Sequence, residues 1–125
     1  MKKSILLLAV AAATIFTSCS SDDSSSSTPS SSFTADATNF KGNINDGTVT
    51  LDPTQTYNLT GALIVNDGAK LVIPAGTTIE ASGGTQSYIA IAQGAKIEVL
   101  GNSSSPVVMT SASTNPAAGD WGGLV

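Results

Sequence analysis

The sequence contains no histidine and no arginine, and only 11% of its residues are charged. Without histidine there is no histidine base, no serine–histidine triad and no histidine-ligated zinc site. Five lysines stand against nine acidic residues, which argues against nucleic acid as a partner, because phosphates are bound mainly by lysine and arginine. The single cysteine, Cys19, excludes an internal disulfide. No apolar run reaches the roughly 20 residues that a membrane-spanning helix needs.

The beginning of the chain has the order of a secretory signal. Met1-Lys2-Lys3 gives a positive start, Ile5 to Phe16 form a short apolar run, and small residues precede Cys19. This order resembles the lipobox of bacterial lipoproteins, although Phe16 stands where that pattern favours leucine. The resemblance implies that residues 1–18 are a cleaved signal peptide and that the Cys19 thiol, a good nucleophile, takes up a covalent lipid. No other cofactor is expected. The alternative is an ordinary signal peptide with an incidental cysteine, or an uncleaved anchor.

A serine- and aspartate-rich stretch follows the cysteine and contains no apolar residue before Phe33. Such a stretch buries too little surface to offset chain entropy, so we expect residues 19–38 to be the lipidated cysteine and a disordered tether. Its first residues resemble the acidic export signal of Bacteroidota surface lipoproteins; they are Ser20, Ser21, Asp22 and Asp23. The resemblance implies a lipid anchor in the outer membrane, with the protein facing the cell exterior. The alternative is that the two aspartates only keep the tether soluble or avoid retention in the inner membrane.

Residues 39–125 differ in composition, and we expect them to form an all-β domain. Short runs rich in valine, isoleucine, threonine and tyrosine are separated by glycine, proline, asparagine and aspartate. No stretch keeps a helical period for three turns. The predicted strands are Thr48–Leu51, Thr56–Thr60, Ala62–Val65, Ala69–Ile73, Thr77–Glu80, Tyr88–Ala92, Lys96–Leu100 and Val107–Thr110.

Two of these segments repeat one another. Gly68–Ile73 matches Gly94–Val99 at an offset of 26 residues (from 68 to 94), and Asp46-Gly47 stands 21 residues before Asp67-Gly68 (from 46 to 67). A drifting period in the low twenties is typical of a solenoid, in which each coil of chain stacks on the last. Stacked coils share backbone hydrogen bonds and bury apolar residues that one coil alone leaves exposed.

At this point the chain resembles the opening coils of a right-handed parallel β-helix of the pectin-lyase-like superfamily. The residues that carry the resemblance are Leu59–Val65, Gly68–Ile79 and Gly119–Leu124. The alternative fold is an immunoglobulin-like β-sandwich, which also has short strands but in which the Gly-Ala-Lys repeat is not expected. Leu124-Val125 resembles the start of a strand and no polar closing repeat follows, so we expect this chain to be the N-terminal part of a longer β-helix. The alternative is a small domain that a partner caps.

The chain offers few groups for catalysis. Four aspartates are scattered and mostly stand beside glycine or proline, where turn formation is the expected role; they are Asp46, Asp52, Asp67 and Asp120. Glu80 and Glu98 occupy strand positions, and nothing in the sequence pairs them as acid and base. Lys70 and Lys96 recur at matching places of the repeat, where solvated side chains are expected. No catalytic residue and no metal site is assigned.

Aromatic rings can bind sugars by stacking, and the candidates are Tyr57, Tyr88 and Trp121. Glycines flank Trp121 and could leave its ring open, although packing across the coil is the favoured role. The sequence therefore predicts a membrane-tethered surface lipoprotein whose β-helix is non-catalytic and either serves as a structural or adhesive rod or binds an extracellular glycan or protein. The alternative is the N-terminal fragment of a polysaccharide lyase or hydrolase whose active site lies in later coils.

Overall fold

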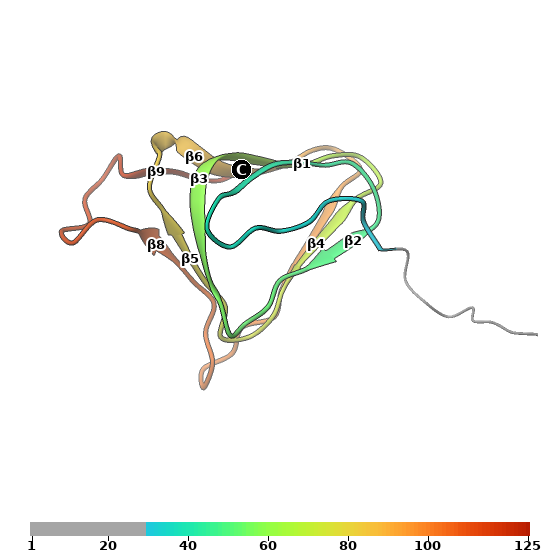
Figure 1. Cartoon of the computed structure of the whole chain (residues 1–125). Coiled ribbons are helices and arrows are strands. Elements are labelled where there is room, and N and C mark those ends of the chain that lie inside the picture. Colours follow the sequence, from blue (N-terminus) through green and yellow to red (C-terminus); the bar gives the residue numbers. More distant parts are fainter. Residues whose placement is uncertain (1–29) are drawn as a thin grey trace, which may run out of the picture.

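The computed structural model describes residues 30–125, which wind into a parallel β-helix (Figure 1). This part of the chain contains strands and turns and no helix, so none of its segments is a helix able to cross a membrane. The predictions for residues 1–18, for Cys19 and for the acidic run after it lie outside the described residues. The strands are β1 (Phe40–Ile44), β2 (Thr48–Thr50), β3 (Thr56–Val65), β4 (Lys70–Ile73), β5 (Thr78–Ala81), β6 (Gly84–Ile91), β7 (Lys96–Val99), β8 (Val108–Ser111) and β9 (Trp121–Leu124).

The coils form a three-sided prism (Figure 1). One side holds β2, β4 and β7; the second holds the first half of β3 with β5 and β8; the third holds β1, the second half of β3, β6 and β9. Every pairing of these strands is parallel, which rules out the sandwich alternative. Viewed along the axis, the chain runs clockwise as its later coils recede, so the winding is right-handed as expected (Figure 1).

The coils lengthen along the chain. Thr48 pairs with Lys70, an offset of 22 residues, and Lys70 pairs with Lys96, an offset of 26. The second pairing confirms the register of the Gly-Ala-Lys repeat. On the next side, Thr78 pairs with Val108 at an offset of 30 residues. The added residues lie at the corners, where the segments 100–107 and 112–120 project from the prism at the bottom and left of Figure 1.

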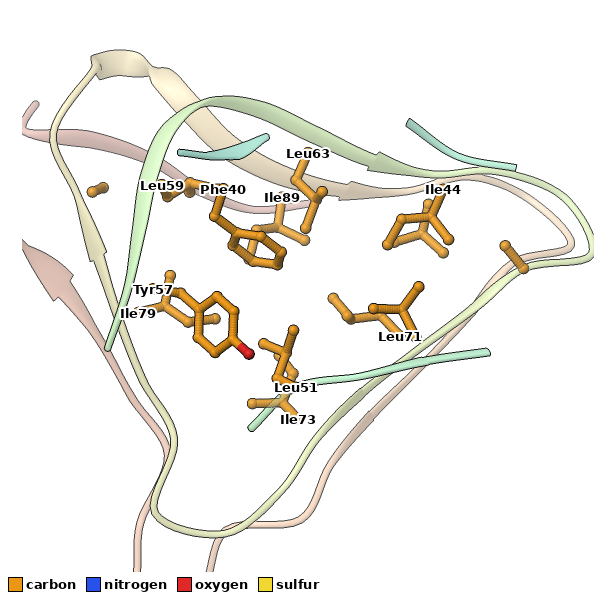
Figure 2. Close-up of a cluster of buried hydrophobic side chains, with 14 residues drawn as sticks. Phe40, Ile44, Leu51, Tyr57, Leu59, Leu63, Leu71, Ile73, Ile79 and Ile89 are labelled. Carbon is orange, nitrogen blue, oxygen red and sulfur yellow. The ribbon is translucent and has the colours of Figure 1, made fainter. Parts of the chain in front are cut away.

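Apolar side chains fill the prism because strand residues alternate between its interior and its surface. Leu71 pairs with Val49 in one neighbouring coil and Ile97 in the other, and Tyr57 pairs with Ile79. These stacks meet in the interior, where the largest side chains point toward one another (Figure 2). Their burial supplies most of the stabilisation, at roughly 1.5–3 kcal/mol for each fully buried side chain of this size.

The folded region begins earlier than the predicted boundary at residue 39. Residues 30–38, which we call the N-terminal strap, were assigned to the disordered tether, yet they are ordered against the first coil. Ser30 forms a bridge with Thr48, and Phe33 packs on the core. The Asn58 N–H donates to the carbonyl of Ala37 at 2.7 Å. The strap therefore supplies strand-like pairing and apolar cover for coil residues that would otherwise face water.

Two further differences concern the strands themselves. The predicted strands on either side of Gly61 form one continuous strand, β3, which bends around a corner of the prism. β1 was not predicted, because glycine and asparagine interrupt its sequence. Its pairing with β3 shifts in register between Phe40 and Gly42, so a short irregular segment still completes the third side.

Candidate functional site

Several aspartates of the described region fix turns, and two of them do so in the same way. Asp36 accepts hydrogen bonds from the hydroxyl and N–H of Thr38 at 2.8 and 2.9 Å. Asp52 accepts from the hydroxyl and N–H of Thr54 at 2.7 and 2.9 Å. The threonine hydroxyl, and then the N–H, holds the pKa of each carboxyl below its usual value, because both stabilise the charged form.

Asp46 bonds to a residue outside its own turn, and Asp120 bonds both within its own turn and to Ser111 at the end of β8. Asp46 accepts from the N–H and hydroxyl of Ser32 at 2.8 and 3.0 Å, and these bonds lower its pKa. Oδ2 of Asp120 accepts from the Ala117 N–H at 2.8 Å and the Ser111 hydroxyl at 2.7 Å, which lower its pKa in that order. The expected structural role is thus confirmed for Asp52 and Asp120, while Asp46 holds the strap.

The remaining charged side chains spread over different sides of the prism. Lys70 and Lys96 are register partners on β4 and β7, and Lys70 Nζ lies 2.6 Å from a carboxylate oxygen of Glu98. Both partners of this ion pair are solvated, so it contributes little stability. Glu80 lies on β5, on another side, so Glu80 and Glu98 do not face one another as acid and base. Within residues 30–125, no three potential ligand side chains gather to hold a metal ion.

The prediction that Tyr57 stacks on a ligand is wrong. Its side chain points into the prism and is only 3% exposed (Figure 2). The ring centroid lies 5.0 Å from that of Phe40, at an interplanar angle of 54°, and its hydroxyl accepts a hydrogen bond from the Asp52 N–H at 2.9 Å. Tyr57 is therefore a core residue that also fastens the turn between β2 and β3.

Trp121 opens β9, where it pairs with Gly84 of β6. It is half-buried and packs against the core cluster. This agrees with the role across the coil that the sequence favoured, and it leaves the ring only partly accessible to a ligand.

Tyr88 faces outward from β6. The residues on either side of it, Ser87 and Ile89, are buried, and alternation along the strand places Tyr88 on the outer face, where it is half-buried. Its register partner in the next coil is Gly123. Leu63 pairs with Ile89, so the neighbour of Tyr88 in the preceding coil is Ala62.

Close packing behind this tyrosine depends on glycine. A Cβ atom at Gly122 would lie 2.9 Å from the Cβ of Tyr88 and 2.7 Å from the carbonyl oxygen of Thr85. We call Tyr88 and its small neighbours Ala62, Gly122 and Gly123 the Tyr88 platform. It combines one aromatic ring with side chains too small to cover it, beside a register shift between Gly84 and Tyr88 in the pairing of β6 with β9.

A family model described as a pectate-lyase-like β-helix domain matches residues 42–125. The chain belongs to this family. The matched span begins inside β1 and includes all later strands, so this β-helix domain contains the Tyr88 platform, while the strap lies before the match. Comparison with curated proteins and with solved structures found no match.

Proposed function

We propose that this protein is a lipid-anchored lipoprotein of the outer membrane, facing the cell exterior, whose β-helix binds an extracellular glycan without cleaving it. The observation that carries the binding proposal is the Tyr88 platform. The anchor and the outward location rest on Cys19 and on the run Ser20, Ser21, Asp22 and Asp23 that follows it.

The Tyr88 ring is suited to a sugar because one face of a pyranose carries mainly C–H groups. An aromatic side chain offers a large apolar face with a polar hydroxyl at its tip, so it can pack on those C–H groups while the sugar hydroxyls stay solvated. Ala62 and Gly123 are too small to block the approach, and the strand that carries the ring pairs with a strand on each side. A rigid ring loses little freedom when a ligand binds, which favours affinity.

Within residues 30–125, the carboxylates are not arranged for glycoside hydrolysis. A general acid for glycosidic cleavage needs a raised pKa and a second carboxyl about 5 to 9 Å away. The pKa values of Asp36, Asp46, Asp52 and Asp120 are lowered instead, and each carboxylate is engaged in holding the backbone. Glu80 and Glu98 occupy different sides of the prism.

The anchor limits how far this domain extends from the membrane. Eleven residue steps separate Cys19 from Ser30, the first residue of the strap. At most about 3.3–3.6 Å is gained per step, so the lipid and the prism are separated by no more than about 40 Å of chain. Two or three acyl chains on Cys19 would hold durably, because each buried methylene contributes roughly 0.8 kcal/mol.

Two substitutions at the platform test the proposal. Tyr88→Ala removes the ring and should weaken binding to a responsive polysaccharide about tenfold, which corresponds to about 1.4 kcal/mol. Tyr88→Phe keeps the ring and should bind nearly as well as the parent. Binding is measured by glycan array and then by affinity electrophoresis in gels that contain the polysaccharide. Equal binding by Tyr88→Ala and the parent, or no binding to any glycan, would overturn the proposal.

A second candidate is a polysaccharide lyase or hydrolase whose catalytic groups lie in further coils of a longer protein. The description of the family, which refers to pectate lyase, favours this candidate. It predicts chain cleavage by the full-length protein, whereas glycan binding alone predicts polysaccharide of unchanged length.

A further inference from the structure

A pocket of about 310 Å³ lies at the corner where β5 leads into β6, beneath the 112–120 segment. Its lining consists of alanines, glycines and a few polar groups; the polar groups come from Ser82, Ser111, Ser113 and Asp120. In the preceding coil the corresponding corner of β3 contains only Thr60-Gly61. The pocket therefore arises where the coil lengthens, and loops of this kind commonly carry binding sites on a rigid scaffold.

The carboxylate of Asp120 is fixed in orientation. Its Oδ2 atom accepts hydrogen bonds from the Ala117 N–H and the Ser111 hydroxyl, which together occupy the lone pairs of that oxygen. Within residues 30–125, Oδ1 of Asp120 has no hydrogen-bond partner. A half-buried carboxylate with one free oxygen is available to a ligand that donates hydrogen bonds.

The serine hydroxyls also act mainly as acceptors toward the pocket. The Ser111 hydroxyl donates its proton to Asp120, and the Ser82 hydroxyl donates to Oδ1 of Asn58 at 2.7 Å. The Ser111 oxygen also accepts from the Ser113 N–H at 2.9 Å, which leaves it one lone pair, while the Ser82 oxygen has lone pairs to offer a ligand. The pocket is thus rich in acceptors, and no lysine lines it.

We propose that this corner pocket binds one neutral sugar unit through its hydroxyl groups and rejects uronic acids. Sugar hydroxyls supply the donors that Asp120 and Ser82 lack, and hydrogen bonds to a charged acceptor are stronger than neutral ones. A uronate carboxylate would instead meet the Asp120 charge with no cation to offset it. The volume is at the lower end for ligand pockets and suits a single monosaccharide. This inference rests on the proposed glycan binding. It names the class of sugar that is bound, at a site separate from the Tyr88 platform.

The test uses the whole chain with four neutral monosaccharides, D-galactose, D-glucose, D-mannose and L-fucose, and with D-galacturonate as the acidic counterpart. Binding is followed by titration calorimetry and by chemical-shift changes of the 111–120 amides. At least one neutral sugar should bind, and galacturonate should bind at least tenfold more weakly. Asp120→Asn keeps the shape of the side chain and should weaken neutral-sugar binding about tenfold, because a charge-assisted hydrogen bond is lost.

Controls separate this proposal from a fold defect and from the platform. Asp52→Asn changes a turn aspartate at another corner and should leave monosaccharide binding unchanged, and the shift changes of the 111–120 amides report the pocket and not the platform. Circular dichroism verifies that Asp120→Asn stays folded, and Ser82→Ala offers a second variant that removes a pocket acceptor. Equal affinity for galacturonate, unchanged binding in both pocket variants, or no binding at millimolar sugar overturns the pocket proposal. If Tyr88→Ala loses polysaccharide binding while both pocket variants bind monosaccharides as the parent does, the proposed function stands and the pocket proposal fails.

Discussion

The carboxylate of Asp46 accepts two hydrogen bonds from Ser32, one from its N–H at 2.8 Å and one from its hydroxyl at 3.0 Å. This contact fastens the strap to the corner between β1 and β2. Phe33 follows directly and packs on the core, so the same short segment is held by polar bonds at the corner and by apolar contact inside. The strap therefore caps the first coil of the β-helix, although its composition is that of a linker.

Acid should destabilise the fold through its aspartates. The carboxyls of Asp36, Asp46, Asp52 and Asp120 have lowered pKa values in the folded protein. Their contribution is fully present above the unfolded pKa, close to 3.8, and is lost as pH falls through the folded values. We expect a constant melting temperature from neutral pH to about pH 5 and a fall below about pH 4. Asp46→Asn should reduce the acid-induced fall measured by thermal denaturation, and an unchanged fall would contradict the role of Asp46.

Close packing of the strap depends on Gly47. This residue has φ 63°, and a Cβ added there would lie 2.7 Å from backbone atoms of Ser30 and Ser31. Gly68 occupies the equivalent corner of the next coil with φ 85°, and a Cβ there would meet no atom within 4 Å. Gly68→Ala should cost roughly 1–2 kcal/mol for the left-handed backbone alone. Gly47→Ala should cost at least about 1 kcal/mol more, because the strap must also move.

The measurement for this pair is urea denaturation followed by circular dichroism. Because both variants carry the same change at equivalent corners, their difference isolates the contact with the strap. If the two variants lose equal free energy of unfolding, the strap is not packed on Gly47 as described.

Truncating a side chain in the buried stack of Val49, Leu71 and Ile97 should cost more free energy of unfolding than truncating one on the exposed part of the last described coil. Leu71 is fully buried between Val49 and Ile97, whereas Val99 is 46% exposed. Leu71→Ala should lower the free energy of unfolding by about 2–5 kcal/mol, since it leaves a cavity between two coils. Val99→Ala should cost less than about 1 kcal/mol. Chemical denaturation gives both values, and equal costs would be inconsistent with the stacked core.

The proposed lipid anchor can be tested at Cys19. In cells that process lipoproteins, mass spectrometry of the mature N-terminus should find acyl groups on Cys19 and no residue before it. Cys19→Ser should remove the acyl mass and release the protein from the membrane fraction. Protease treatment of intact cells should digest the parent protein if it faces outward. An intact, unlipidated Cys19 would overturn the anchor, and resistance to the protease would overturn surface display.

The register of the stacked coils could be predicted from the sequence, because residues that match in the repeat are register partners on neighbouring coils. Lys70 and Lys96, matched in the sequence at an offset of 26, are direct partners in the structure. The strap could not be predicted, because its serines mask the few apolar residues that pack, chiefly Phe33. β1 was missed for a related reason, since Gly42 and Asn43 break the pattern expected of a strand.

The alternation of inward and outward residues along a strand decides which tyrosine can contact a ligand, and this alternation is present in the sequence. Tyr57 has the same parity as Leu59 and so points inward with it, whereas Tyr88 adjoins the inward Ile89 and points out. The corner pocket had no such signal. It depends on the hydrogen bonds that draw Ser111 and Ala117 to Asp120, and those follow from the path of a long loop.

Polysaccharide chain length after incubation with the protein distinguishes glycan binding from glycan cleavage. A polysaccharide retained by the parent protein, and released by Tyr88→Ala, is incubated with the parent and then sized by gel filtration, with reducing ends and unsaturated products assayed in the same sample. We expect the protein to retain the polysaccharide, with its chain length unchanged and no new reducing ends. Shortened chains or unsaturated products, formed by protein free of other enzymes, would contradict it.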